Sequence, residues 1–169
     1  MIVLRPHILL LLISTLLLGA CSSAVRWDPQ PATRTASKPS RVVLHRNASL
    51  GAEVVRTANL QVGVPYRYGG ASPRGFDCSG LVHYAYREAG QRVPRTTTAL
   101  YRTAQPVSLD ELRPGDILFF YFDDKVGHVA SYTGGGGFVH APSSGKRVMQ
   151  GTLRDRFWRE RLVSAGRLF

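Results

Sequence analysis

The order of the hydrophobic patterns along the chain limits the folds that it can adopt. Apolar residues recur at helical spacing in two segments of residues 49–89, whereas β-type apolar runs occupy much of residues 117–168. Ser49 is expected to cap the first helix, which ends before Gly63, and Cys78 is expected to begin the second. This order predicts an α+β fold, with N-terminal helices packed on a mostly antiparallel sheet.

The sheet is expected to have five or six strands. A short helical or irregular segment is expected near residues 96–103, and a short helix near residues 153–161. The expected strands are 117–122, 126–132, 138–141, 147–150 and 162–168.

Residues 1–20 are typical of a secretory signal peptide. Arg5 precedes an apolar run over residues 8–18, and small residues lead into Cys21. The run is shorter than the roughly 20 residues that a membrane-spanning helix needs, so an uncleaved anchor is the weaker alternative. Residues 18–21 also resemble a bacterial lipobox, which implies that Cys21 carries lipid after cleavage and anchors the protein to a membrane.

The mature chain is expected to be a tethered single domain. Residues 21–48 begin with the lipidated cysteine and are rich in Pro, Ser, Thr and Arg, which predicts a flexible tether. Residues 49–169 are expected to form the folded domain. In a Gram-negative cell, Ser22 after the cysteine resembles an outer-membrane sorting signal, so the domain is expected in the periplasm.

The formal net charge of +11 indicates an anionic neighbour. An exported protein rarely meets nucleic acid, and the sequence has no basic helix or basic patch interleaved with aromatic residues. We therefore expect loose affinity for an anionic cell envelope and no nucleic-acid partner.

The chain has two cysteines, Cys21 and Cys78. They could form a disulfide, but lipidation of Cys21 would leave Cys78 as a lone thiol, and a lone thiol in an exported protein is a candidate reactive group. Asp77 can cap the helix that starts at Cys78, and the helix N-terminus is expected to lower the pKa of the thiol. A buried, inert cysteine is the alternative.

Two of the five histidines are candidate partners for this thiol. His128 and His140 flank the glycine run 134–137, and a hairpin centred on Gly134 would place them directly opposite each other. His128 could then act as the base and His140 could orient it. His83 lies five residues after the cysteine and is expected to point away from it.

A zinc site made of Cys78, His128 and His140 is a competing interpretation. These residues lack the short ligand spacings of common zinc motifs. We therefore expect no metal and no organic cofactor.

Six motifs follow one another along the expected domain, at residues 65–70, 75–82, 94–96, 112–116, 127–129 and 139–141. In order and approximate spacing they resemble those of the NlpC-type cell-wall peptidases, and the resemblance covers about residues 49–169. That family has a papain-like α+β fold and hydrolyses the peptide stems of peptidoglycan, so the resemblance implies the same fold and activity here.

The resemblance implies roles for seven residues. By its position in these motifs, Cys78 resembles the family's nucleophile. In the same way, His128 resembles the base and His140 resembles the residue that orients the base. The residues expected to bind substrate, shape the cleft or stabilise the oxyanion are Tyr66, Asp77, Ser79 and Arg95. The chain departs from the family pattern at Ser131 and Thr133, which are more polar than usual.

The expected reaction is cleavage of the D-Ala–diaminopimelate cross-link by a monomeric enzyme. Cleavage between D-glutamate and the diamino acid is the alternative. Outside this class, the same fold could serve a non-catalytic peptidoglycan-binding lipoprotein, or an acyltransferase or amidase.

Overall fold

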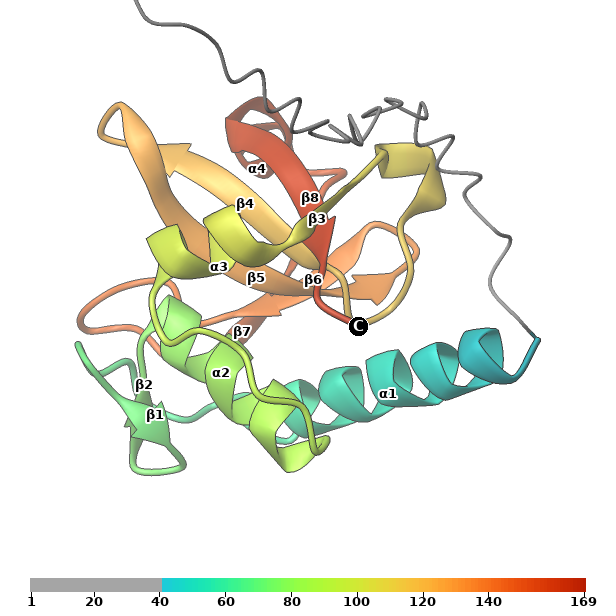
Figure 1. The fold of residues 1–169 in the computed structure, drawn as a ribbon. Helices are drawn as coiled ribbons and strands as arrows, with labels where there is room; N and C mark the ends of the chain where they lie inside the picture. The colour runs from blue at the N-terminus through green and yellow to red at the C-terminus, as the bar shows by residue number, and fades with distance from the viewer. Residues whose placement is uncertain (1–40) are drawn as a thin grey trace, which may run out of the picture. The chain divides into compact units, whose positions relative to one another are not determined.

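The structure, a computed structural model, describes residues 41–169 (Figure 1). The predicted signal peptide, lipidated Cys21 and residues 21–40 of the predicted tether lie outside the described residues. Within the described part, no helix is both long enough and apolar enough to cross a membrane.

The first helix begins earlier than predicted. Helix α1 spans Arg41–Asn59, so residues 41–48, assigned above to the tether, are helical. Neither glycine nor proline interrupts these residues. The Ser49 hydroxyl donates a 2.7 Å hydrogen bond back to the Arg46 carbonyl, which is the behaviour of a serine inside a helix. The prediction that Ser49 caps the helix was therefore wrong.

Helix α2 follows the prediction closely, spanning Cys78–Glu88. The Asp77 carboxylate caps it by accepting a 2.6 Å hydrogen bond from the Gly80 N–H. Gly90, with φ of 82°, lies just beyond the helix end. Helix α3 spans Thr97–Thr103 and Thr96 caps it, as the segment near 96–103 suggested.

Six strands form one antiparallel sheet in the order β3-β8-β4-β5-β6-β7, which confirms the predicted fold class. The sequence analysis missed the short edge strand β3 and the small β1–β2 hairpin, Ala71–Ser72 and Gly75–Phe76. The strands of the sheet are β3 Gln105–Val107, β4 Ile117–Phe122, β5 Lys125–Gly134, β6 Gly137–His140, β7 Met149–Thr152 and β8 Leu162–Arg167.

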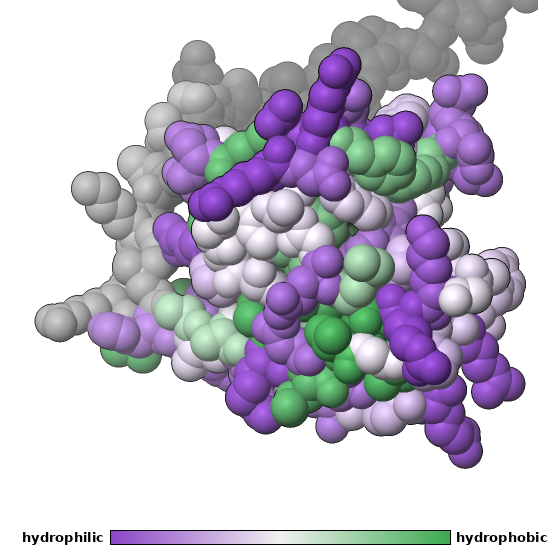
Figure 2. Space-filling view, turned by 180° about the vertical axis from the view of Figure 1, so that it is seen from behind, coloured by the Kyte–Doolittle hydropathy of each residue, from purple (hydrophilic) through white to green (hydrophobic). Residues whose placement is uncertain are grey.

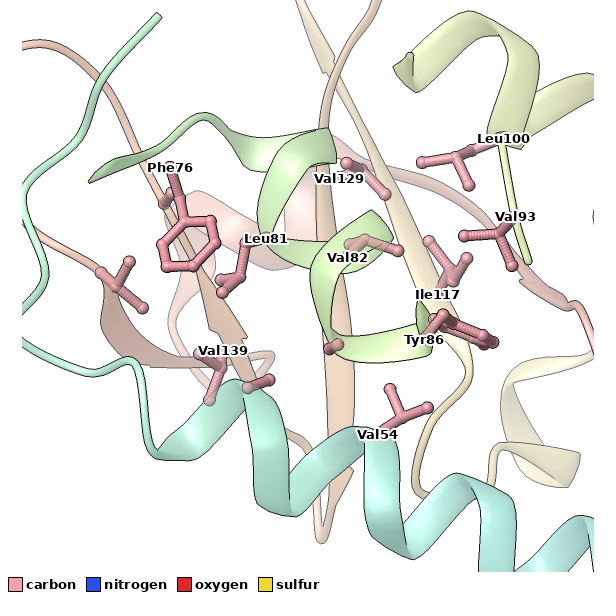
Figure 3. Close-up of a cluster of buried hydrophobic side chains, with 14 of the residues drawn as sticks. Val54, Phe76, Leu81, Val82, Tyr86, Val93, Leu100, Ile117, Val129 and Val139 are labelled. Atoms are coloured by element: carbon pink, nitrogen blue, oxygen red, sulfur yellow. The ribbon is translucent and has the colours of Figure 1, made fainter. Parts of the chain in front are cut away.

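Each face of the sheet has its own hydrophobic cluster. One face packs on α1 and α2, and Val54 of α1 points toward Tyr86 of α2 (Figure 3). The other face packs against Trp158 of helix α4, which spans Arg156–Arg161. Burial on both faces accounts for the continuous apolar run of β4.

The outer surface of the described residues mixes apolar and hydrophilic side chains. Figure 2 shows apolar surface in the lower half of the view, bordered by hydrophilic side chains. Several ion pairs on the surface, such as Arg56 with Glu53, are largely exposed and contribute little to stability.

A buried ion pair joins the turn before β4 to the last strand. The Asp116 carboxylate is fully buried and accepts 2.7 Å hydrogen bonds from Nε and Nη2 of Arg167. It also accepts one from the Arg113 N–H, while the Tyr86 hydroxyl donates to the Gly115 carbonyl at 2.7 Å. The turn is thereby fixed both to the sheet and to α2.

Replacing Asp116 by Asn should strongly destabilise the protein. The substitution leaves the Arg167 charge without its partner, and breaking a buried pair costs about 3 kcal/mol or more. Urea unfolding followed by circular dichroism measures the loss. Glu53→Gln, which breaks an exposed pair, is the control and should unfold like the wild type. Equal unfolding midpoints for both variants would contradict the structural role of Asp116.

Candidate active site

Cys78 is the first residue of α2 and is half-buried in a cleft. Its Sγ lies 3.7 Å from the Thr97 hydroxyl at the start of α3. The backbones of Val129 and Ser79 lower the pKa of the thiol, so both act on the sulfur. The thiol therefore lies where α2, α3 and β5 meet.

The protonation state of Cys78 differs from the prediction. Burial is the largest influence on the thiol and raises its pKa, whereas the Thr97 hydrogen bond lowers it and the Asp77 charge raises it. The prediction that the helix start gives a lowered pKa was therefore wrong in direction. A neutral thiol needs a base to remove its proton before it can attack a substrate.

His128 and His140 lie in direct contact. Nε2 of His128 is 2.9 Å from Nδ1 of His140, and both side chains are buried. The predicted register was wrong, because Tyr132 pairs with Phe138 and Ser131 with Val139. This shifts the strands by two residues from the expected pairing. An even shift keeps both histidines on one face of the sheet, so they meet as diagonal neighbours.

Burial keeps both histidines neutral. It lowers the pKa of His128 to about 3, helped by the neighbouring His140. It lowers the pKa of His140 to about 4, helped by the Lys146 charge. At neutral pH, a single proton lies between the two facing nitrogens, so one ring donates and the other accepts.

Aromatic rings enclose the histidine pair. The Trp158 ring centroid lies 4.7 Å from that of His140 and 5.7 Å from that of His128. Phe120 and Phe122 lie 6.0 and 5.8 Å from His128. The sequence analysis missed Trp158, since only its position on α4 brings it to the site.

Arg95 links the residues that flank Cys78. Its guanidinium donates to both Asp77 carboxylate oxygens, at 2.9 and 2.8 Å, and to the Ser79 hydroxyl at 3.0 Å. It also donates to the Gly70 carbonyl at 3.0 Å. A Cβ on Gly80 would lie 1.9 Å from that same carbonyl oxygen, so only glycine fits there.

Tyr66 also lines the cleft. Burial raises the pKa of its hydroxyl, and the nearby Cys78 and Asp77 charges add to this effect. Its backbone N–H donates to the Lys146 carbonyl at 2.8 Å. The lining of the cleft includes Tyr66, Tyr68, Asp77, Cys78, Ser79, Arg95, Thr97 and Gly127. The structure thus brings Tyr66, Asp77, Cys78, Ser79 and Arg95 to one cleft. His128 lines a neighbouring cavity that shares Gly127 with this cleft, and His140 contacts His128.

The structure also bears on His83 and on the competing zinc site. His83 Nδ1 contacts the Val93 carbonyl at 2.9 Å, which is a structural role. Within residues 41–169, Cys78, His128 and His140 do not form a ligand set, and no group of three His, Cys, Asp or Glu side chains does.

The NlpC/P60 family model matches residues 63–167, more than half of the chain. The chain belongs to the NlpC/P60 family. It is 42% identical over 114 residues to the murein DD-endopeptidase MepH of Escherichia coli, covering 64% of this chain and 42% of MepH. It is 33% identical over 120 residues to the Bacillus subtilis γ-D-glutamyl-L-lysine dipeptidyl-peptidase, covering 69% of this chain and 40% of that protein. The chain thus spans less than half the length of these two relatives.

Solved structures carry the same fold. An NlpC/P60 family protein from Bacillus cereus superposes with a TM-score of 0.66 at 32% identity, over 69% of this chain and 39% of that one. The NlpC/P60 domain of the peptidoglycan hydrolase SagA superposes with a TM-score of 0.62 at 32% identity, over 70% of this chain and 98% of that one. The second match covers almost a whole domain, so this NlpC/P60 domain is the common unit.

The stability of the domain should fall in mild acid. His128 and His140 have folded pKa values of about 3 and 4, below the ordinary 6.5, so unfolding takes up protons below that pH. Their stabilising effect is present above pH 6.5 and is lost as the pH falls toward the folded values. At pH 5, each of the two histidines should lower the free energy of unfolding by about 2 kcal/mol relative to its value at neutral pH.

Urea unfolding at pH 7 and pH 5 measures this loss. His140→Gln should reduce the difference between the two pH values, whereas His45→Gln, at an exposed position of α1, should leave it unchanged. An identical pH dependence in all three proteins would argue against a neutral histidine pair.

Proposed function

We propose that this NlpC/P60 protein is a cysteine peptidase that hydrolyses peptide bonds in the stems of peptidoglycan. The single observation that carries the proposal is the buried contact between His128 and His140 in a chain of this family. Gly127, the residue before His128, lines the cleft that contains Cys78. The names of MepH and SagA, as a murein endopeptidase and a peptidoglycan hydrolase, support the substrate class.

The proposed reaction is acyl transfer through a thioester. His128 takes the thiol proton of Cys78, and the resulting thiolate attacks the stem-peptide carbonyl carbon. The tetrahedral intermediate collapses, the C–N bond breaks, and the protonated His128 gives its proton to the leaving amine. Water, deprotonated by the same imidazole, then hydrolyses the thioester and restores the thiol. The N–H of Cys78 at the helix start is the proposed oxyanion donor.

The neutral state of His128 suits these reaction steps. A neutral imidazole whose Nε2–H donates to Nδ1 of His140 has a free Nδ1 that can accept the thiol proton. His140 fixes this tautomer and stabilises the imidazolium that forms during the reaction. The same arrangement makes His140 a positioning residue.

The residues around Cys78 divide into two proposed roles. Tyr66 offers its hydroxyl to the substrate or to the oxyanion from the wall of the cleft. Asp77 and Ser79 are already hydrogen-bonded to Arg95, so we propose that the three contact substrate as one unit. The rigidity of that unit would position the acyl part of the substrate.

We propose the D-Ala–diaminopimelate cross-link as the bond that is cut. The higher identity to MepH than to the γ-D-glutamyl dipeptidyl-peptidase supports this preference. Cleavage next to D-glutamate is the second candidate, supported by the match to the dipeptidyl-peptidase.

Digestion of cross-linked peptidoglycan tests the proposal. Residues 21–169 carrying Cys21→Ser keep every described residue and leave Cys78 as the only thiol. Mass spectrometry should detect monomeric stems with this protein and none with the added Cys78→Ala substitution, because the thioester cannot form. The fragment masses identify the bond. A folded protein that binds peptidoglycan but releases no fragments would favour the non-catalytic alternative.

We also propose that the protein is a monomeric lipoprotein attached through Cys21, facing the periplasm from the outer membrane in a Gram-negative cell. Labelling with radioactive palmitate and membrane fractionation test the anchor. Cys21→Ser should remove the label and release the protein to the soluble fraction, whereas Cys78→Ser should leave both unchanged. Palmitate label on the Cys21→Ser protein would contradict the proposal.

A further inference from the structure

A second cavity adjoins the cleft of Cys78 on the side of His128. It encloses about 380 Å³ between β4, β5, α4 and the loop after β6. Gly127 lines both spaces, and a glycine puts no side chain between them. The cleft that contains Cys78 and the cavity that contains His128 therefore adjoin at Gly127.

The proposed chemistry assigns each of these two adjoining spaces to one part of the substrate. In acyl transfer, the base that removes the thiol proton returns it to the departing amine, so that amine must lie beside His128. The acyl part of the substrate must lie beside Cys78. The cavity that contains His128 is thus the space available to the leaving amino acid.

The lining of the cavity combines aromatic walls with a single charge. Phe122, Phe157 and Trp158 form its apolar surface, and the rings of Phe157 and Trp158 lie 5.2 Å apart, edge to face. Lys146 is its only formally charged lining residue, and none of the lining residues is acidic. Such a space suits an aliphatic chain that carries a carboxylate.

Lys146 is held at the junction of the two spaces. Its carbonyl accepts a 2.8 Å hydrogen bond from the N–H of Tyr66, which lines the cleft. Its charge acts on His140 and lowers the pKa of that imidazole. The backbone therefore ties the loop of Lys146 to the wall of the cleft, while Lys146 lines the same cavity as His128.

We propose that this cavity is the leaving-group subsite and that Lys146 recognises a carboxylate on the carbon bearing the departing amine. The inference rests on the proposed peptidase function. In a D-Ala–diaminopimelate cross-link, that carbon carries a free carboxylate. In a D-Ala–lysine cross-link, the corresponding carbon carries none, so the two bonds differ at the group that Lys146 would bind.

Turnover of two matched substrates tests the inference. Residues 21–169 with Cys21→Ser are given disaccharide-free stem dimers cross-linked through either D-Ala–diaminopimelate or D-Ala–lysine. We expect kcat/KM for the diaminopimelate dimer to be about tenfold higher, as for loss of a charged hydrogen bond. Lys146→Gln should abolish the preference, whereas Lys125→Gln, in the neighbouring hairpin and outside both spaces, should keep it.

Equal kcat/KM for the two dimers, or a preference that survives Lys146→Gln, overturns the inference while leaving the peptidase function intact. If neither dimer is cut, the proposed cleavage of the cross-link is wrong. A binding measurement then tests whether the cavity recognises the carboxylate. Trp27→Phe leaves Trp158 as the only tryptophan, so its fluorescence reports on the cavity directly. Tighter binding of meso-diaminopimelate than of lysine, lost on Lys146→Gln, supports the subsite; equal binding of both overturns it.

Discussion

The Asp77 carboxylate connects the segments that surround Cys78. One oxygen caps α2 through the Gly80 N–H, and the other accepts a 2.9 Å hydrogen bond from the Gly69 N–H. Both oxygens also bind Arg95, two residues before Thr97. One partly buried anion thus fixes the helix start, the loop after Tyr66 and the approach to α3. Since the pair is only partly exposed, the cost of separating its charges is much larger than for a surface pair.

The histidine pair depends on a different kind of environment. Its rings are enclosed by Phe120, Phe122 and Trp158, so water cannot stabilise an imidazolium there. The same enclosure that keeps His128 neutral, and hence able to accept a proton, makes its protonation in acid costly to the fold. The ability of neutral His128 to accept a proton and the expected loss of stability in acid therefore have one physical cause.

Burial acts in the same direction on the thiol. It favours the neutral form of Cys78, as it favours the neutral form of His128. Because burial favours the neutral form of both groups, transfer of a proton from the Cys78 thiol to the His128 imidazole is unfavourable, and the proposed reaction must overcome this cost. The Thr97 hydroxyl and the backbones of Val129 and Ser79 are the groups available to stabilise the thiolate once it forms.

Local patterns in the sequence determined much of this architecture. Helical spacing and the Asp77 cap identified α2, and apolar runs located strands β4–β8, because these features depend on neighbouring residues. The three reactive side chains could also be chosen from the sequence, and their catalytic roles stay predictions. The prediction for the start of α1 was wrong. Ser49 can cap a helix, but its hydroxyl instead donates a hydrogen bond to a carbonyl inside the helix.

Only the tertiary structure decided how distant segments meet. The β5–β6 register depends on where the glycine turn closes, and four consecutive glycines allow several positions. Trp158 and Lys146 reach the histidines through α4 and the loop after β6, so no local pattern marks them. The sequence selected the residues capable of chemistry, because that depends on the side chain itself. Their protonation states and neighbours required the folded chain, because burial and long-range packing set the local dielectric.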